Sequence, residues 1–393
     1  MRLSLIEPGP HGGLLHYLAQ LGDALADRGH TVELLTARDN ELVGRPSRAR
    51  MRAELPRTVE GTESPPPGLP YRKRQARVAL QLARCWGRIL IEARTGRHDA
   101  LITGADIGMV PTAAAALALT AIPGRPPLVR IAHNIRTYNR WGGENLFRGS
   151  PVLDLILKQA LPRFDLTLLP GERARDEYEA SWPRSRTAIV PHGDERLFAD
   201  EPPPPAGEER VLFFGEWRKV KGLPVLMDAF DELLERRPSV RLTIAGTPIA
   251  TDADPDAVRR WAAERGDSVE VIDRYVPIDE VAAIFARARV VVTPYLTGAQ
   301  SGIVALAMTM ARAVVTSDVG ELGHVVGDRV GGRVVTPGDP HELAVALEEI
   351  VSNRDLATRY GDENRRKASS SAGWEHAAER LERALTSLLA GSV

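Results

Sequence analysis

Residues 213–222, FFGEWRKVKG, place three cations within four positions between two glycines. Arg218, Lys219 and Lys221 follow an apolar, strand-like run, and lysine is rare elsewhere in this arginine-rich chain. Cations just beyond the end of a buried strand can form charge-assisted hydrogen bonds with phosphate oxygens. They can also stabilise the negative charge that develops on a departing diphosphate. A solvated basic turn is the ordinary alternative, and these ten residues leave both interpretations open.

Two further turns have the residue types of anion-binding sites. GPHGG, residues 9–13, follows the first strand-like run, and its small residues allow backbone N–H groups at a helix N-terminus to approach an anion. It is neither a G-x-G-x-x-G pattern nor a P-loop. The segment 295–320 contains Gly298 and Gly302, and a helix is predicted to begin near Ser301, whose hydroxyl suits an N-cap. An ordinary strand–helix turn has the same composition.

A histidine follows a later strand candidate. His133 ends PLVRIAH, and a histidine in that place is more often structural than catalytic. Arg136, Tyr138 and Trp141 follow it. They either line an acceptor site or pack in the interior.

These turns belong to an alternation of strands and helices. After the first strand candidate, Leu14, Leu18, Leu21 and Leu25 form one apolar helix face, and TVELLTA reads as the next strand. Such βαβ units predict parallel sheets covered by helices, in the α/β class. The strand candidates are residues 2–7, 31–37, 99–104, 127–133, 165–170, 186–193, 210–215, 240–246, 268–273, 289–294 and 313–317.

The alternation occurs in two halves. The proline-rich stretch 199–209 is the clearest linker, so we expect a Rossmann-like domain at 1–200 and another at 201–372. Residues 373–393 are expected to form a helix that packs back on the first domain. Residues 43–78 break the alternation and are predicted to be a long excursion, partly loop. Ligands of open α/β sheets bind beyond the carboxyl ends of the strands, so two facing halves predict a central cleft.

Composition narrows the function classes. The chain has 393 residues and a formal net charge of -1, which gives no drive toward nucleic acid. One cysteine, Cys85, excludes an internal disulfide and fits a cytoplasmic location. The longest uncharged stretch, 107–124, contains a proline and many alanines, so a buried helix is favoured over a membrane span. The arginines at 43–97 either meet an anionic membrane surface or form a solvated surface.

Taken in order, the motifs resemble those of the large retaining glycosyltransferase family 4, which has the GT-B fold. The similar segments are GGLLHYLAQLGDALADRGHTVELLTA, IVPHGDERLF, VLFFGEWRKVKGLPVLMDAFDELL, RYVPIDEVAAIFARARVVVTPYL, AQSGIVALAM, AVVTSDVGEL and GWEHAAERLERALTSLL. Their order and spacing are more specific than any one of them. The resemblance covers nearly the whole chain and is weakest across 43–110.

The resemblance implies a sugar transfer with retention at the anomeric carbon and without a cofactor or metal. The implied donor is a UDP- or GDP-linked nucleotide-sugar, and the implied acceptor is a small molecule or a lipid-linked one, as in polysaccharide or natural-product glycosylation. Arg218 and Lys221 match the catalytic cation pair, and His133 matches the histidine near the reacting centre. The residues that match donor-binding positions are Gly12, Gly13, Gly215, Arg218, Lys221, Tyr275, Val276, Gln300, Ser301, Gly302 and Ile303.

The chain departs from the family pattern at three places. Glu216 stands where many members have arginine, and Ala299 and Ala307 replace the usual Glu-x7-Glu pair. A subgroup with a Gln-Ser-Gly signature also lacks that pair, and residues 299–302 look like it. Two other functions therefore stay open: a catalytically silent partner that binds nucleotide-sugar, and a GT-B-fold nucleotide-sugar epimerase.

Overall fold

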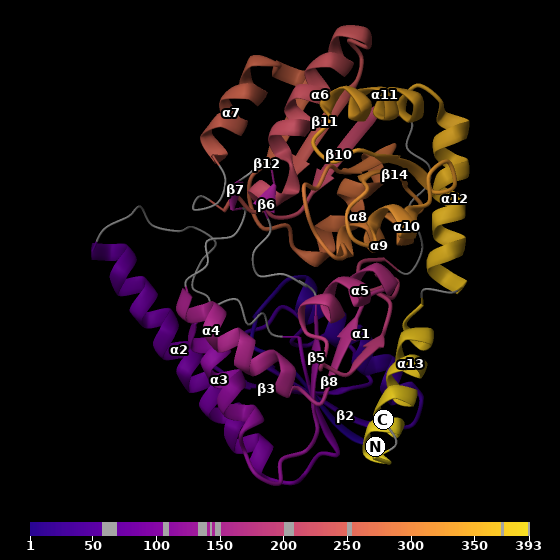
Figure 1. Cartoon of the computed structure of the whole chain (residues 1–393). Coiled ribbons are helices and arrows are strands. Elements are labelled where there is room, and N and C mark those ends of the chain that lie inside the picture. The colour runs from indigo at the N-terminus through magenta and orange to yellow at the C-terminus, as the bar shows by residue number, and fades with distance from the viewer. Residues whose placement is uncertain are drawn as a thin grey trace.

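The computed structural model describes residues 1–56, 69–104, 110–132, 140–141, 144–145, 151–199, 208–249, 254–370 and 373–391. Within these residues, parallel strands form one sheet of seven strands and one of six, each flanked by helices (Figure 1). A short antiparallel pair, β6 (Arg140–Trp141) and β7 (Glu144–Asn145), forms a separate ribbon. The predicted α/β class with two Rossmann-like units is confirmed.

In the first unit the strands follow the order β3-β2-β1-β4-β5-β8-β9. The chain therefore reverses its direction of winding between β1 and β4, and ligands of such sheets bind at this switch point. The strands are β1 (Arg2–Glu7), β2 (Thr31–Ala37), β3 (Arg50–Leu55), β4 (Ala100–Thr103), β5 (Leu128–Ile131), β8 (Leu166–Leu169) and β9 (Thr187–Ile189). The helices are α1 (Gly13–Asp27), α2 (Leu69–Arg94), α3 (Val110–Thr120), α4 (Pro151–Ala160) and α5 (Glu172–Ser181).

The second unit has the order β12-β11-β10-β13-β14-β15, with its switch point between β10 and β13. Its strands are β10 (Arg210–Phe214), β11 (Arg241–Ala245), β12 (Val269–Ile272), β13 (Val290–Thr293), β14 (Ala313–Ser317) and β15 (Gly332–Val335). Its helices are α6 (Leu223–Arg236), α7 (Pro255–Glu264), α8 (Ile278–Arg287), α9 (Gly302–Thr309), α10 (Leu322–Val326), α11 (Pro340–Val351) and α12 (Arg354–Ser370). Short 3-10 turns are η1 (Leu161–Arg163), η2 (Lys219–Lys221) and η3 (Gly266–Ser268).

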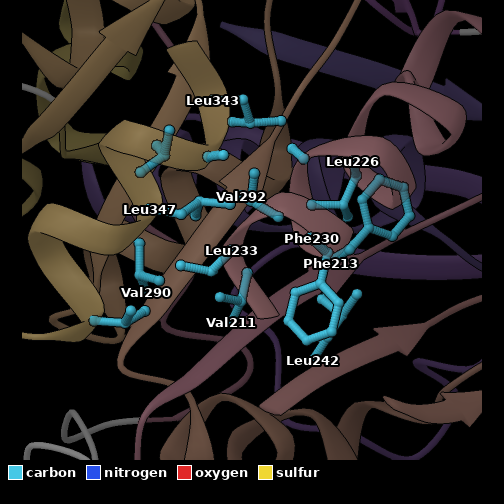
Figure 2. Close-up of a cluster of buried hydrophobic side chains, with 14 of the residues drawn as sticks. Val211, Phe213, Leu226, Phe230, Leu233, Leu242, Val290, Val292, Leu343 and Leu347 are labelled. Atoms are coloured by element: carbon cyan, nitrogen blue, oxygen red, sulfur yellow. The ribbon is translucent and has the colours of Figure 1, made fainter. Parts of the chain in front are cut away.

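Helix α6, which follows the switch point of the second sheet, is packed into the core of the second unit. Leu226, Phe230 and Leu233 of α6 are fully buried against strand residues such as Val211 and Val290 (Figure 2). Each such side chain contributes roughly 1.5–3 kcal/mol by leaving water. The apolar period of residues 223–233 thus fixes α6, and with it the turn that precedes α6.

The predicted excursion at 43–78 is only partly correct. Residues 50–55 form strand β3, which pairs in parallel with β2 at the edge of the first sheet. Its sequence, RMRAEL, is half-buried and charged, so it lacks the apolar run of a central strand. Helix α2 begins at Leu69, inside the predicted excursion. The strand β15 was also missed, because GRVV is short and begins with glycine.

Helix α13 (Trp374–Leu389) lies beside α1 of the first unit, near both chain ends (Figure 1). Trp374, Leu381 and Leu385 are buried in the core of that unit. The uncharged stretch at 107–124 contains helix α3. Among the described residues, no helix has both the length and the apolar character needed to cross a bilayer.

Candidate functional site

The basic turn lies at the switch point of the second sheet, between the ends of β10 and β13. The backbone N–H of Leu296, beyond β13, donates to the carbonyl of Val220 at 2.9 Å. Gly222 closes the turn in the left-handed region (φ 67°), and a Cβ there would lie 1.9 Å from the carbonyl oxygen of Pro294. Glycine is therefore required, because the turn and the end of β13 touch backbone to backbone.

Lys221 is held over an aromatic ring. Its Nζ lies 3.7 Å from the ring centroid of Tyr295, a cation–π contact that orients the ammonium. The Tyr295 hydroxyl is 3.2 Å from Oγ of Ser301, which caps α9 by accepting from the N–H of Val304. A cation and a helix N-terminus from two different loops are thus linked through one tyrosine.

The other two cations of the turn differ in environment. Arg218 donates from Nε to the Glu216 carboxylate at 2.6 Å, so the glutamate in the unusual position holds the arginine. Lys219 is exposed. Any phosphate that binds Arg218 must share this guanidinium with Glu216.

Helix α9 begins at Gly302 with Ser301 as its N-cap, as the sequence predicted. Gln300, Ser301, Gly302 and Ile303 are half-buried. The Ile303 side chain packs near Gly215, where a Cβ would lie 3.6 Å from it. The first glycine of the basic turn and the first turn of α9 are therefore neighbours.

The alanines in place of the glutamate pair are both buried. Ala299 packs with Leu169, Ala174 and Tyr178 of the first unit. Ala307 is completely buried in the core of the second unit. In this arrangement a ligand would have to be recognised by other residues than these two.

The glycine loop of the first unit contacts a residue that the sequence interpretation missed. Gly12, the N-cap of α1 (φ 96°), donates its N–H to Glu41 Oε1 at 2.7 Å, and Gly13 begins the helix. His16 Nε2 lies 2.7 Å from the same oxygen. Across the units, the Tyr275 hydroxyl lies 2.8 and 2.6 Å from the two carboxylate oxygens. No local pattern marks Glu41, because all three partners are brought to it by the tertiary fold.

This cluster shifts two pKa values in opposite senses. Burial acts to raise the pKa of Glu41, but the hydrogen bonds from His16, Tyr275 and Gly12 outweigh it and hold that pKa below its usual value. Burial, and then the adjacent carboxylate, raise the pKa of Tyr275. Val276, the next residue, is 5% exposed and belongs to the core, so only its backbone can border a ligand.

A second missed pair lies in the segment that joins the units. Glu195 accepts from Gln20 Nε2 at 2.7 Å, and its N–H donates to Thr309 Oγ1 of α9 at 2.8 Å. His192 Nε2 is 3.5 Å from Glu195 Oε1. A Cβ on Gly302 would lie 3.5 Å from this nitrogen and 3.7 Å from this oxygen, so the pair sits against the start of α9.

Burial gives the pair unusual protonation states. Desolvation raises the pKa of Glu195 to about 8. The hydrogen bond from Gln20 opposes this rise, and the nearby Asp194 adds a smaller contribution to it. Desolvation lowers the pKa of His192 to about 4 against the opposing hydrogen bond to the Gly193 carbonyl. At neutral pH His192 is neutral and Glu195 mostly protonated, so a buried charge is avoided at this junction.

Carboxyl-end loops of the two units face one another at further points. Glu321 Oε1 accepts from the N–H of Ala174 at 2.8 Å and so caps the start of α5 from the other unit. Arg173 pairs with Asp318, and Arg45 with Asp279, both at 2.7 Å. The predicted histidine, His133, lies outside the described residues.

Two family models match the chain, one for each half. Residues 11–193 match "Glycosyltransferase Family 4" and residues 208–353 match "Glycosyl transferases group 1". The chain is 30% identical to O-antigen chain mannosyltransferase C of Escherichia coli, over 47% of this chain and 48% of that protein. It is 26% identical to phosphatidyl-myo-inositol mannosyltransferase of Mycolicibacterium smegmatis, over 92% of this chain and 87% of the relative.

Solved structures share the fold at low identity. The Anabaena protein HepE, determined in complex with UDP-glucose, matches with a TM-score of 0.69 at 16% identity. The match covers 98% of this chain and 100% of HepE.

Proposed function

The chain is a glycosyltransferase with the GT-B fold, and we propose that it moves a sugar from a UDP- or GDP-linked donor to an acceptor hydroxyl. The observation that carries this proposal is the contact of Lys221 with Tyr295, whose hydroxyl reaches the N-cap Ser301. Two groups that suit phosphate therefore converge at a switch point. The UDP-glucose complex of HepE supports the choice of donor.

In the proposed reaction, Lys221 and Arg218 hold the diphosphate and stabilise the charge that develops as it leaves. Residues 300–303 contact the donor sugar and phosphates, and the loop of Tyr275 and Val276 borders the base. Gly12 and Gly13 face the reacting centre from the first unit. No metal is required, because these cations and the helix N-terminus supply the positive potential.

We further propose that the sugar is transferred with retention, by a same-face mechanism in which the leaving phosphate helps to deprotonate the acceptor. Determining the anomeric configuration of the product by NMR tests this step. A product of inverted configuration would contradict it.

The first experiment is thermal unfolding with UDP, GDP, dTDP and ADP at millimolar concentration. A nucleotide that binds only the folded protein raises Tm. At a hundredfold excess over its Kd, it adds roughly 2.7 kcal/mol to the free energy of unfolding. We expect one nucleotide to do so, and Lys221→Ala to abolish its shift. Lys219→Ala is the matched control, because the exposed lysine two positions away should leave the shift intact.

Turnover distinguishes transfer from silent binding. Arg218→Ala and Lys221→Ala are each expected to lower kcat by about 10²-fold, the scale seen when one oxyanion donor is removed. A nucleotide shift without turnover on any acceptor would favour the silent partner. No shift with any nucleotide would contradict the donor assignment.

We also propose that the acceptor is reached at a membrane surface through helix α2. The exposed side chains in the described part of this helix are basic or apolar: Arg77, Leu80, Ala83, Arg84, Arg88, Ile91 and Arg94. Leu80 and Ile91 are 53% and 60% exposed, and such a stripe suits anionic lipid headgroups.

Vesicle sedimentation tests this contact. We expect the protein to bind phosphatidylglycerol vesicles but not phosphatidylcholine vesicles. The Ile91→Asp variant should lose the binding to phosphatidylglycerol vesicles. Val345→Asp is the control, because Val345 is also exposed (44%) but lies on α11 of the other unit. Equal binding of both variants would contradict a role for α2 and favour a soluble acceptor.

A further inference from the structure

A second candidate site lies at the amino ends of the strands of the first sheet. A pocket of about 320 Å³ opens there beside the first residues of β1, β2 and β3. Its lining is dominated by charged side chains, among them Arg2, Arg50, Arg52, Arg97, Glu33 and Glu54.

This pocket is separate from the proposed donor site. The glycine loop follows the carboxyl end of β1, whereas Arg2 begins that strand. Six residues at about 3.3 Å each put roughly 20 Å between the two. A ligand in this pocket is therefore independent of the proposed function.

The floor of the pocket is a fixed ion network. Arg52, whose side chain is 12% exposed, pairs with Glu33, Glu54 and Glu92 at 2.7–3.0 Å. His98 Nε2 lies 3.1 Å from Glu33. These groups hold one another in place, so the floor presents a defined set of hydrogen-bonding atoms.

The rim carries arginines that can change partners. The side chains of Arg2 and Arg50 are 56% and 78% exposed, and each forms a surface ion pair, with Asp99 and Glu33. Exposed pairs of this kind are weak. Arg97 is exposed and forms no ion pair among the described residues. A phosphate can therefore recruit these guanidinium groups at little cost, in bidentate geometry.

The floor carboxylates can also accept from a ligand. Glu33 accepts from Arg50, Arg52 and His98, and Glu54 from Arg52 and Arg88. Two carboxylate oxygens offer about four acceptor positions, so each glutamate retains capacity for a hydroxyl. A simple anion has no hydroxyls to donate, whereas a polyol does.

We propose that this pocket binds a phosphorylated sugar or polyol, with its phosphate on the rim arginines and its hydroxyls on Glu33 and Glu54. The lining has four arginines and two glutamates. With the charged residues that pair with them, Asp99, Glu92 and Arg88, the set has five arginines and four carboxylates, and it remains net positive. Such a ligand would bind outside the donor site.

A metal ion is the competing occupant. Ligand atoms of Glu33, Glu92 and His98 lie within 4.8 Å of one another. However, Nη1 of Arg52 donates to both glutamates, at 3.0 and 2.7 Å. A guanidinium therefore already supplies the positive charge in this cluster, which favours the organic phosphate.

Isothermal titration with glucose 6-phosphate as the probe tests the proposal. We expect millimolar or tighter binding, and at least tenfold weaker binding of glucose or inorganic phosphate alone. The double variant Arg50→Ala/Arg97→Ala should lower the affinity for the probe at least tenfold. Arg48→Ala is the matched control, since that arginine is equally exposed (75%) but pairs with Asp27 away from the pocket.

Lys221→Ala separates this site from the donor site, because it should leave the affinity of the probe unchanged. Loss of binding in Lys221→Ala but not in the double variant would overturn the proposal and place the probe in the donor site. Absence of binding, or equal binding of inorganic phosphate, would also overturn it. Both altered arginines are exposed, and an unchanged Tm of the double variant verifies its fold.

Discussion

At the scale of the residue, burial has altered the protonation of side chains that lie against the start of α9. Glu195 is buried between Gln20 and Thr309, and burial keeps it protonated to a pH near its raised pKa of about 8. A glutamate in water loses its proton near pH 4.3. Between about pH 4.3 and pH 8, Glu195 therefore holds a proton in the folded chain that it has lost in the unfolded chain. The contribution of Glu195 to stability is therefore complete below about pH 4.3 and decreases as pH rises through about 8.

We predict that Glu195→Gln removes this dependence, because the amide imitates the protonated acid. The Tm of the variant should exceed that of the parent, and the difference should grow from pH 5 to pH 8. The difference in unfolding free energy should reach a few kcal/mol at most. Scanning calorimetry across this range measures it. Glu375→Gln, at an exposed position, should show no such growth. A gain that does not vary with pH would contradict the assigned protonation state.

At the scale of the element, two turns are joined at the switch point of the second sheet. Gly222 lets the basic turn touch the end of β13, and the N–H of Leu296 ties the two together. Through this contact Lys221 lies over the Tyr295 ring, whose hydroxyl reaches Ser301. The geometry of the turn thus depends on a residue that carries no functional group.

Gly222→Ala tests this dependence. Its Cβ would collide with the Pro294 carbonyl, so we expect a loss of more than about 2 kcal/mol in unfolding free energy. The nucleotide-induced Tm shift should disappear as well. Gly266→Ala is the control, because that glycine also has a positive φ (52°) but its Cβ would meet open space. It should lose only about 1 kcal/mol, from backbone strain alone. Equal losses in urea unfolding would show that the backbone contact does not matter.

At the scale of the whole molecule, the two units meet through the loops at the carboxyl ends of their strands. Glu41 of the first unit accepts from Tyr275 of the second, and Glu321 of the second caps α5 of the first. Helix α13 spans back to α1, which adds an apolar link. These contacts set the distance between the glycine loop and the basic turn.

Tyr275→Phe is predicted to loosen this arrangement, since it removes one hydrogen bond to the half-buried carboxylate of Glu41. Such a bond contributes about 1.5–3 kcal/mol. We expect a larger radius of gyration by small-angle scattering and a lower free energy of unfolding. Tyr360→Phe, in the core of the second unit, should leave the radius unchanged. An unchanged radius in Tyr275→Phe would show that other contacts hold the units together.

The sequence by itself determined the class of fold, the two-unit plan and the position of the basic turn. These features follow from local patterns: the apolar period of residues 223–233, the glycines at 215 and 222, and the serine that caps α9. The sequence did not predict edge strand β3, because a charged, half-buried strand has no apolar run. The roles of the candidate-site residues stay predictions until their variants are measured.

Tertiary structure alone decided which residues surround these turns. Glu41 contacts Gly12, His16 and Tyr275, and Glu195 contacts Gln20 and Thr309, partners that are up to 234 residues away in the chain. Hydrogen bonds and desolvation depend on distance in space, so no spacing in the sequence reveals them. The same holds for the arginine pocket, which is assembled from the starts of strands that are neighbours only in the folded sheet.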